Sequence, residues 1–124
     1  MPLPILIMIL LSVTLSALAQ ISLKAGMSTA HVSQALAGGS PLAIGTSILM
    51  EPYVLLGLFA YGASMAIWLF VLAKTDVSLA YPFVSIGFLI TLALGVLLLG
   101  EHLSPLRIAG TMLVTLGVFL VARG

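Results

Sequence analysis

Polar side chains follow one face of the first apolar segment of this sequence. Ser12, Ser16, Gln20 and Lys24 recur at intervals of four residues. Residues four apart lie on neighbouring turns of one helix face, so these side chains form a stripe that ends in a positive charge. Because an ammonium group makes short, charge-assisted hydrogen bonds to phosphate oxygens, the stripe is a candidate binding surface for an anionic ligand. In the alternative interpretation, the polar groups join neighbouring helices and Lys24 extends to the lipid headgroups.

Aromatic residues lie inside the next two apolar segments. Tyr61 and Trp68 are seven residues apart in the second segment, and Tyr81 precedes Pro82 in the third. Tyr and Trp often mark the membrane interface, but Tyr61 and Trp68 lie too far inside their segment for both to be interface anchors. We expect these rings either to contact a ligand or to pack against another helix.

A charged loop follows the third segment and contains Glu101, His102 and Arg107. Arg107 is a second candidate for binding a phosphate group. Glu101 is either a ligand-binding residue or an ordinary carboxylate at the membrane interface. Its expected partners are Arg107, His102 and Lys24.

Several kinds of chemistry are excluded by what the sequence lacks. It has no cysteine, and its two histidines lie in different predicted loops, so we expect neither thiol chemistry nor a metal site. No motif pairs a nucleophile with a base, and no glycine-rich phosphate loop occurs. We therefore expect a protein that is not an enzyme and has no cofactor. A net charge of +1 is too small for nucleic-acid binding.

The composition places these residues in a membrane. Hydrophobic residues make up 62% of the chain and charged residues 6%, whereas a soluble domain carries about 25% charged residues. A helix needs about 20 mostly apolar residues to cross the hydrocarbon core. Such segments occur at residues 3–25, 52–73, 77–99 and 104–122. We predict an all-α membrane protein, a single four-transmembrane-helix bundle over residues 1–124.

The connections between the predicted spans differ in length. The second and third connections have only a few residues, so the helices that they join are antiparallel neighbours. The first contains the breaker cluster Gly38-Gly39-Ser40-Pro41, followed by an apolar stretch at residues 41–50. We expect a short interfacial helix here with Ser40 as its cap; the alternative is an extension of the second span. In the third span, Pro82 has no N–H, which predicts a kink.

The N-terminal segment has a second interpretation. Ala17-Leu18-Ala19, just before Gln20, matches the A-x-A cleavage pattern of a secretory signal. However, no Lys or Arg precedes the apolar run, and the run continues past this point to about Lys24. We therefore expect the segment to be retained as a transmembrane helix.

Glycine spacing and charge distribution predict a dimer. Gly110 and Gly117 are seven residues apart, which puts both on one contact seam of the fourth span. The four Lys and Arg residues divide equally between the two sides of the membrane, so the positive-inside rule selects no orientation. Four short helices also leave little room for a head group inside one chain. We expect a homodimer, or a heterodimer with a related subunit, joined by the fourth span.

Three stretches resemble the drug/metabolite transporter superfamily, which includes EamA-like proteins. Residues 16–24 are similar to its opening helix, residues 79–104 (LAYP through LGEHLS) to its third, and residues 108–118 to its closing helix. The small multidrug resistance branch implies antiparallel dimers, a Gly-x6-Gly seam and an essential glutamate midway along the first helix. This sequence has SVTLS at residues 12–16 instead. The Ala-Gln and Leu-Lys of helix one and the Ala-Tyr-Pro of helix three resemble the flippase subunits for aminoarabinose-phosphoundecaprenol, which also lack that glutamate and act as pairs.

The resemblance and the polar stripe imply a small dimeric transporter that moves a polyprenyl-phosphate-linked sugar, or a similar anionic lipid, across the bacterial inner membrane. The phosphate would bind Lys24 and Arg107, the polar stripe would shelter the head group, and the three aromatic rings would contact the sugar. Two alternatives stay open. One is an exporter of metabolites, cations or drugs coupled through Glu101 or another route, and the other is a membrane scaffold subunit that transports nothing.

Overall fold

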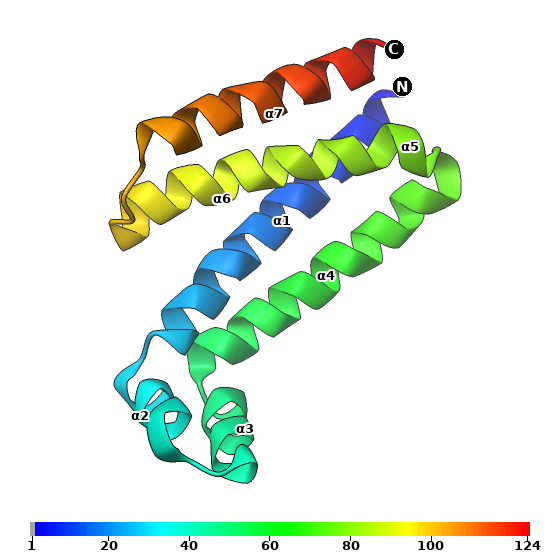
Figure 1. The fold of residues 1–124 in the computed structure, drawn as a ribbon. Helices are drawn as coiled ribbons and strands as arrows, with labels where there is room; N and C mark the ends of the chain where they lie inside the picture. Colours follow the sequence, from blue (N-terminus) through cyan, green and yellow to red (C-terminus); the bar gives the residue numbers. More distant parts are fainter. Residues whose placement is uncertain (1) are drawn as a thin grey trace.

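The structure is a computed structural model that describes residues 2–124, and apart from the two ends these residues lie in helices or in the connections between helices (Figure 1). Four helical segments are long and apolar enough to cross a membrane. They are α1 (Leu3–Met27), α4 (Pro52–Lys74), the segment Val77–Leu99, and α7 (Pro105–Arg123). In lipid, each such segment satisfies its own backbone hydrogen bonds, which favours helices. The predicted all-α fold with four transmembrane helices is therefore confirmed.

Prolines and polar caps set the starts of the helices. Proline stands in the first turn of α1, of α3 (Pro41–Leu49), of α4 and of α7, where a missing N–H costs nothing. The Ser40 hydroxyl accepts a hydrogen bond from the Ala43 N–H at 3.3 Å, and Ser104 accepts one from the Arg107 N–H at 3.2 Å. Asp76 occupies the N-cap position of α5, but its carboxylate makes no capping bond.

The third span is interrupted at its proline. It consists of α5 (Val77–Ala80), the 3₁₀ turn η1 (Tyr81–Phe83) and α6 (Val84–Leu99). Pro82 cannot donate a backbone hydrogen bond, so the regular helical pattern fails at this point. The distortion predicted at Pro82 is present as this turn. Gly100 then ends α6 in the left-handed conformation, with φ of 68°.

The first connection contains two short helices, α2 (Ala30–Gly38) and α3, at one end of the bundle (Figure 1). Ser40 caps α3 as expected, and α3 ends at Leu49, before the start of α4. Helix α2 has no counterpart in the sequence prediction. Its nine residues bury a single side chain, Val32, which is too little for a periodic signal.

Helix α1 is the centre of the structure. It packs along α4 on one side and against α6 on another, while α7 lies outermost, beside α6 (Figure 1). Glycines allow these close approaches: a Cβ at Gly57 would lie 2.8 Å from the Leu23 side chain and 3.1 Å from the Ala19 carbonyl oxygen. A Cβ at Gly87 would lie 3.3 Å from the Val13 carbonyl oxygen. Small residues therefore bring α4 and α6 onto α1, as in other membrane helix pairs.

The Gly57→Ala substitution tests this contact. We expect it to lower the free energy of unfolding by about 1–3 kcal/mol, because the added methyl group overpacks the α1–α4 interface. The matched control is Gly62→Ala on the same helix, where a Cβ would meet no atom within 4 Å. The control should be neutral or stabilising by up to about 1 kcal/mol, since Ala favours helix over Gly. Denaturation in mixed micelles, followed by the fluorescence of the single tryptophan, measures both; equal effects would contradict the interface.

Candidate functional site

A pocket of about 270 Å³ opens between α1, α4 and the α5–α6 segment. Its lining consists of Ser12, Val13, Ser16, Tyr61, Ser64, Met65, Trp68, Tyr81 and Val84. Five of the ligand-binding candidates predicted from the sequence are thus brought together, namely the two serines of the stripe and the three aromatic residues. The pocket is open to the outside of the chain, since Tyr81 at its edge is 63% exposed, so the expectation that the interior of one chain leaves little room for a head group stays a prediction.

The two serines of the pocket make different hydrogen bonds. The Ser12 hydroxyl is buried and donates to the Ser64 carbonyl oxygen at 2.8 Å, which joins α1 to α4. The Ser16 hydroxyl donates to the Val13 carbonyl oxygen of its own helix at 3.0 Å. Since each hydroxyl has used its proton, both oxygens are left as hydrogen-bond acceptors toward a ligand.

The stripe continues beyond the pocket toward the end of α1. The Gln20 amide donates from Nε2 to the Tyr61 hydroxyl at 2.9 Å, so Gln20 is linked to the pocket through a lining residue. Lys24 is exposed in the last turn of α1 and forms no ion pair with any of residues 2–124. With a rise of about 1.5 Å per residue, Lys24 lies about 12 Å along the axis from Ser16.

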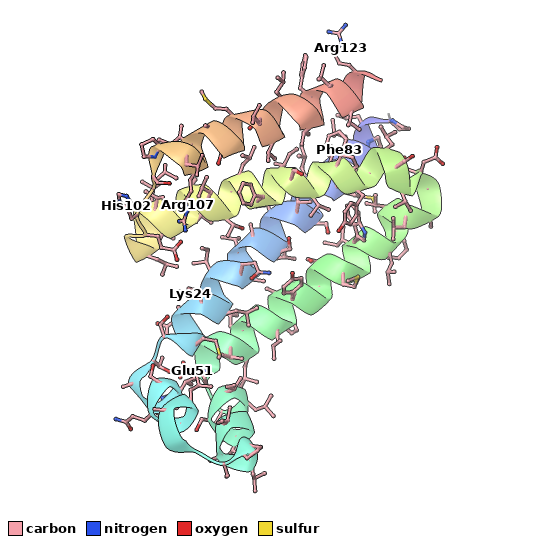
Figure 2. All side chains as sticks on the ribbon, viewed as in Figure 1. Lys24, Glu51, Phe83, His102, Arg107 and Arg123 are labelled. Atoms are coloured by element: carbon pink, nitrogen blue, oxygen red, sulfur yellow. The ribbon has the colours of Figure 1, made fainter. Side chains whose placement is uncertain are left out.

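Glu101 and Arg107 lie apart from this pocket. With His102 and Ser104 they line a second, polar pocket of about 480 Å³ between α6 and α7. Figure 2 shows His102 and Arg107 at the same end of the bundle as Lys24, and Arg123 at the opposite end. Arg107 donates from Nη1 to the His102 carbonyl oxygen at 3.1 Å.

The prediction that Glu101 pairs with a nearby cation is wrong within this chain. Among residues 2–124, Glu101 makes no salt bridge to Arg107, His102 or Lys24. Its N–H donates to the Gly95 carbonyl oxygen at 3.1 Å, and a Cβ at Gly95 would lie 2.6 Å from its Oε1. The left-handed Gly100 turns the chain back, so the carboxylate folds over the end of α6 instead of toward α7.

The predicted contact seam of α7, at Gly110 and Gly117, faces open space within residues 2–124. A Cβ at Gly110 or Gly117 would meet no atom within 4 Å, and α7 buries no residue at all. Gly110 also lines an apolar groove of about 480 Å³ with Phe88, Leu92, Arg107, Thr111 and Val114. Within a single chain, this helix therefore leaves a long apolar surface uncovered.

One buried charge was missed from the sequence. Glu51, at the start of α4, is only 4% exposed, and His31 on α2 pairs with it. In the sequence Glu51 marks only the edge of a span, and His31 stands in an apparent loop. The two residues are 20 positions apart, and His31 lies on a helix that the sequence pattern does not predict. The one feature of the sequence that pointed to Glu51 is its position directly before Pro52, where a glutamate can cap the start of a helix.

The comparison with protein families decides the membership of this chain. The sequence model of the Small Multidrug Resistance protein family matches residues 40–114. The chain belongs to this family. The match includes α4, the Pro82 turn, α6 and the first half of α7, so it covers both walls of the α6–α7 groove.

Individual relatives carry a more specific name. The chain is 33% identical over 124 residues to a probable 4-amino-4-deoxy-L-arabinose-phosphoundecaprenol flippase subunit ArnF of Shewanella sediminis, covering 94% of this chain and 86% of the relative. It is 34% identical over 73 residues to a probable subunit ArnE of the same flippase from Pseudomonas fluorescens, covering 59% of this chain and 64% of the relative. No solved structure matches this chain.

These findings bear out the suspected resemblance to small multidrug resistance proteins and to flippase subunits. Together with the four apolar helices, they identify a small multi-pass membrane transporter. The relatives are transporter subunits, not enzymes. Within residues 2–124, no group of three His, Asp or Glu side chains is placed to hold a metal ion.

A pair of substitutions on α1 tests the geometry of the pocket. Ser12→Ala should lower the free energy of unfolding by about 0.5–1.5 kcal/mol, because it removes a buried hydrogen bond between α1 and α4. Ser16→Ala is the control, since the Ser16 bond lies within its own helix; we expect a change within about 0.5 kcal/mol. Denaturation in mixed micelles measures both. An equal loss for the two variants would contradict the interhelical role of Ser12.

Proposed function

We propose that this protein moves a polyprenyl-phosphate-linked sugar, or a closely similar anionic lipid, across the bacterial inner membrane. The observation that carries the proposal is the pocket in line with the polar stripe of α1. Hydroxyl groups and aromatic rings line the pocket, Gln20 extends it, and Lys24 stands at the end of the same face. A head group that is polar at one end and anionic at the other matches this order.

The chemistry of the pocket suits a sugar. Aromatic rings present flat apolar faces, and Tyr61 and Trp68 lie beside Ser12 and Ser16. Both serine hydroxyls donate to backbone carbonyl oxygens, so their own oxygens keep lone pairs that can accept hydrogen bonds from a ligand. The pocket is open, since Tyr61 is 37% exposed and Tyr81 63% exposed at its edge. An open side lets a polyprenyl chain stay in lipid while the head group binds.

The position of the cations supports an anionic group. Lys24 has a free ammonium group near the membrane surface, and Arg107 lies at the same end of the bundle (Figure 2). Either side chain can form charge-assisted hydrogen bonds to phosphate oxygens. The two relatives above are named as probable flippase subunits for 4-amino-4-deoxy-L-arabinose-phosphoundecaprenol, which is a lipid of this chemical class.

The family membership also favours a second candidate, export of a small cation, metabolite or drug. Such a substrate calls for a carboxylate in the binding pocket, and proton exchange calls for one as well. Among the described residues that line the pocket of α1 and α4, none is acidic. We therefore place the exporter second, with Glu101 as its candidate coupling residue, and a scaffold that transports nothing third.

The assembly that we propose is a dimer, either of two copies or with a related subunit. It rests on α7, which buries no residue within its own chain and presents Gly110 and Gly117 without obstruction. Small residues on one seam let two helices approach closely in lipid.

Transport in proteoliposomes tests the role of Lys24. The purified protein is assayed with a panel of polyprenyl-phosphate sugars, alone and with a related subunit. We expect Lys24→Gln to reduce the rate of lipid movement by about 10- to 100-fold, the range for losing one charge-assisted hydrogen bond. The control Lys74→Gln removes the exposed lysine in the last turn of α4, at the other side of the membrane, and should leave the rate unchanged.

Several outcomes of this assay would count against the proposal. An unchanged rate in a folded Lys24→Gln protein contradicts the assignment of Lys24. Movement of no lipid by the wild type under either condition contradicts the flippase function. Uptake of a cation that depends on a pH gradient would instead support the exporter.

Replacing the glycines of α7 tests the dimer. Gly110→Leu and Gly117→Leu together should shift the protein from dimer to monomer by at least about tenfold in its dissociation constant, because bulky side chains separate the two helices. Gly62→Leu on α4, also at an unobstructed position, is the control. Mass measurement by light scattering in detergent gives the oligomeric state. A dimer that survives the α7 substitutions would place the interface elsewhere.

A further inference from the structure

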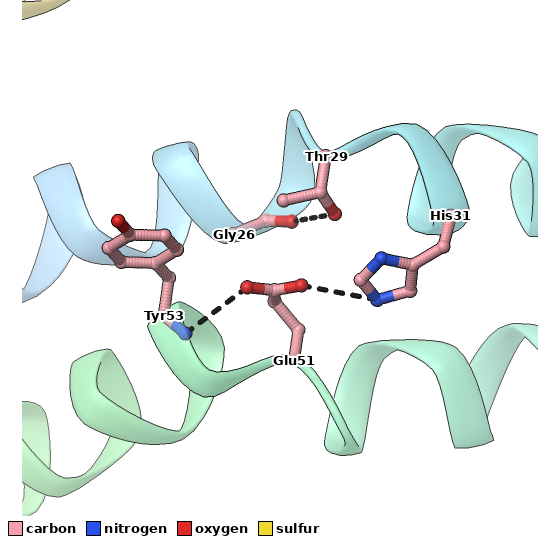
Figure 3. Close-up of polar contacts among 5 residues, drawn as sticks. All are labelled: Gly26, Thr29, His31, Glu51 and Tyr53. Atoms are coloured by element: carbon pink, nitrogen blue, oxygen red, sulfur yellow. Dashed lines mark hydrogen bonds and ion pairs between the residues drawn. The ribbon is translucent and has the colours of Figure 1, made fainter.

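One ion pair stands outside the proposed transport site. His31 Nε2 lies 3.1 Å from Glu51 Oε2 (Figure 3), and it is the one salt bridge found among residues 2–124. The two side chains differ sharply in environment: that of His31 is 53% exposed and that of Glu51 is 5% exposed. The pair therefore joins a solvent-accessible imidazole to a fixed, buried carboxylate.

Glu51 is held from two sides. Its Oε1 accepts a hydrogen bond from the Tyr53 N–H at 3.3 Å, so the carboxylate caps α4 (Figure 3). A negative charge is favourable at this end of a helix. The Glu51 side chain also covers Gly26 of α1, where a Cβ would lie 3.1 Å from the Glu51 Cγ. The carboxylate is thus a fixed anchor on the contact between α1 and α4.

His31, in contrast, belongs to the helical hairpin α2–α3, which is lightly held. Helix α2 buries only Val32, and α3 buries no residue. The turn from α1 to α2 is stabilised by the Thr29 hydroxyl, which donates to the Gly26 carbonyl oxygen at 2.9 Å. With so little apolar burial, the pair of His31 and Glu51 is a main contact that ties the hairpin to the bundle.

We propose that His31 and Glu51 form a pH-responsive latch that holds the α2–α3 hairpin against the joined ends of α1 and α4. Histidine is the side chain that normally changes its charge between about pH 5 and pH 8. A neutral imidazole can still donate a hydrogen bond to the carboxylate, whereas a protonated imidazole adds the Coulomb attraction between two opposite charges. The latch holds most tightly at mildly acidic pH and loosens as the pH rises.

Few other charges compete at this site. The remaining titratable side chains near this end of the elements that meet here are Lys24 on α1 and Tyr53 on α4, and α3 carries none. Within residues 2–124, neither side chain bonds to the carboxylate, since Tyr53 donates only its backbone N–H. The pH response of the hairpin is therefore assigned to His31. It does not depend on which substrate the protein moves.

Thiol labelling tests the latch, because the chain has no cysteine of its own. Val32→Cys places a thiol at the buried position of α2, and Ser33→Cys places one at the exposed neighbouring position. The ratio of their labelling rates with a water-soluble maleimide, in the reconstituted full-length protein, cancels the pH dependence of the thiol itself. We expect the labelling rate of Val32→Cys divided by that of Ser33→Cys to rise about two- to fivefold between pH 6 and pH 8. This is the range that the free energy of a half-exposed ion pair supports.

Variants of the pair make the test specific. His31→Gln should give a high ratio at both pH values, and Glu51→Gln should do the same while it keeps an acceptor for the Tyr53 N–H. His31→Lys carries a permanent cation and should give a low ratio at both. A ratio that does not change with pH in the His31 protein, or that is the same in His31→Gln, overturns the latch. Unchanged fluorescence of Trp68 shows that each variant is folded.

Discussion

The close contact between α1 and α4 is the constraint on which the rest of the structure depends. At Gly26 the two helices approach so closely that a Cβ would lie 2.8 Å from the Val54 backbone nitrogen. The three side-chain hydrogen bonds found between transmembrane helices within residues 2–124 all cross this one interface. They are the bonds from Ser12 to the Ser64 carbonyl oxygen, from Gln20 to the Tyr61 hydroxyl, and from Ser22 to the Tyr53 carbonyl oxygen. The bonds of Gln20 and Ser22 lie near Gly57 and Gly26, where the lack of a side chain lets the two helices approach closely, so packing and polar contacts stabilise each other there.

The polar groups of the same interface serve the fold and are also available to the pocket that we propose. In hydrocarbon a polar group without a partner is costly, and the Ser12 hydroxyl has a partner because it donates to the Ser64 carbonyl oxygen; its own oxygen keeps lone pairs for the ligand that we propose. Gln20 likewise binds Tyr61, which a ligand contact would have to share. A pocket built from such groups is ordered before the ligand arrives. A head group of the proposed substrate would bind the serine oxygens without breaking an existing bond, since each oxygen still has a free lone pair.

The outer elements are held much less tightly than this centre. Helix α7 buries no residue, and the hairpin α2–α3 buries only Val32. Elements with little burial are the ones that open or change partners at low cost in free energy. They are also the elements to which our proposals give assembly and pH response, whereas α1, α4 and the α5–α6 segment line the candidate pocket. The match to the small multidrug resistance family includes both kinds of element. It covers the well-packed helices α4 and α6 and the first half of the exposed helix α7.

The sequence by itself determined the membrane location, the number of transmembrane helices and the faces that carry polar groups. These features follow from local rules: the length of apolar runs, the missing N–H of Pro82, and the four-residue spacing of Ser12, Ser16, Gln20 and Lys24. Only the tertiary structure decided which faces meet. It brought Tyr61, Trp68 and Tyr81 to the serines, left Glu101 and Arg107 elsewhere, and paired His31 with Glu51.

The physical reason is that a lipid-facing helix and a buried one have nearly the same composition. The spacing of apolar residues, which reveals the inner face of a helix in a soluble protein, therefore gives almost no information about the inner face here. Which helix faces meet depends on how small residues such as Gly26 and Gly57 fit against particular side chains of the neighbouring helix. The sequence does not say which side chains those are. Helix α2 shows the limit most clearly, because its place depends on one buried valine and one long-range ion pair.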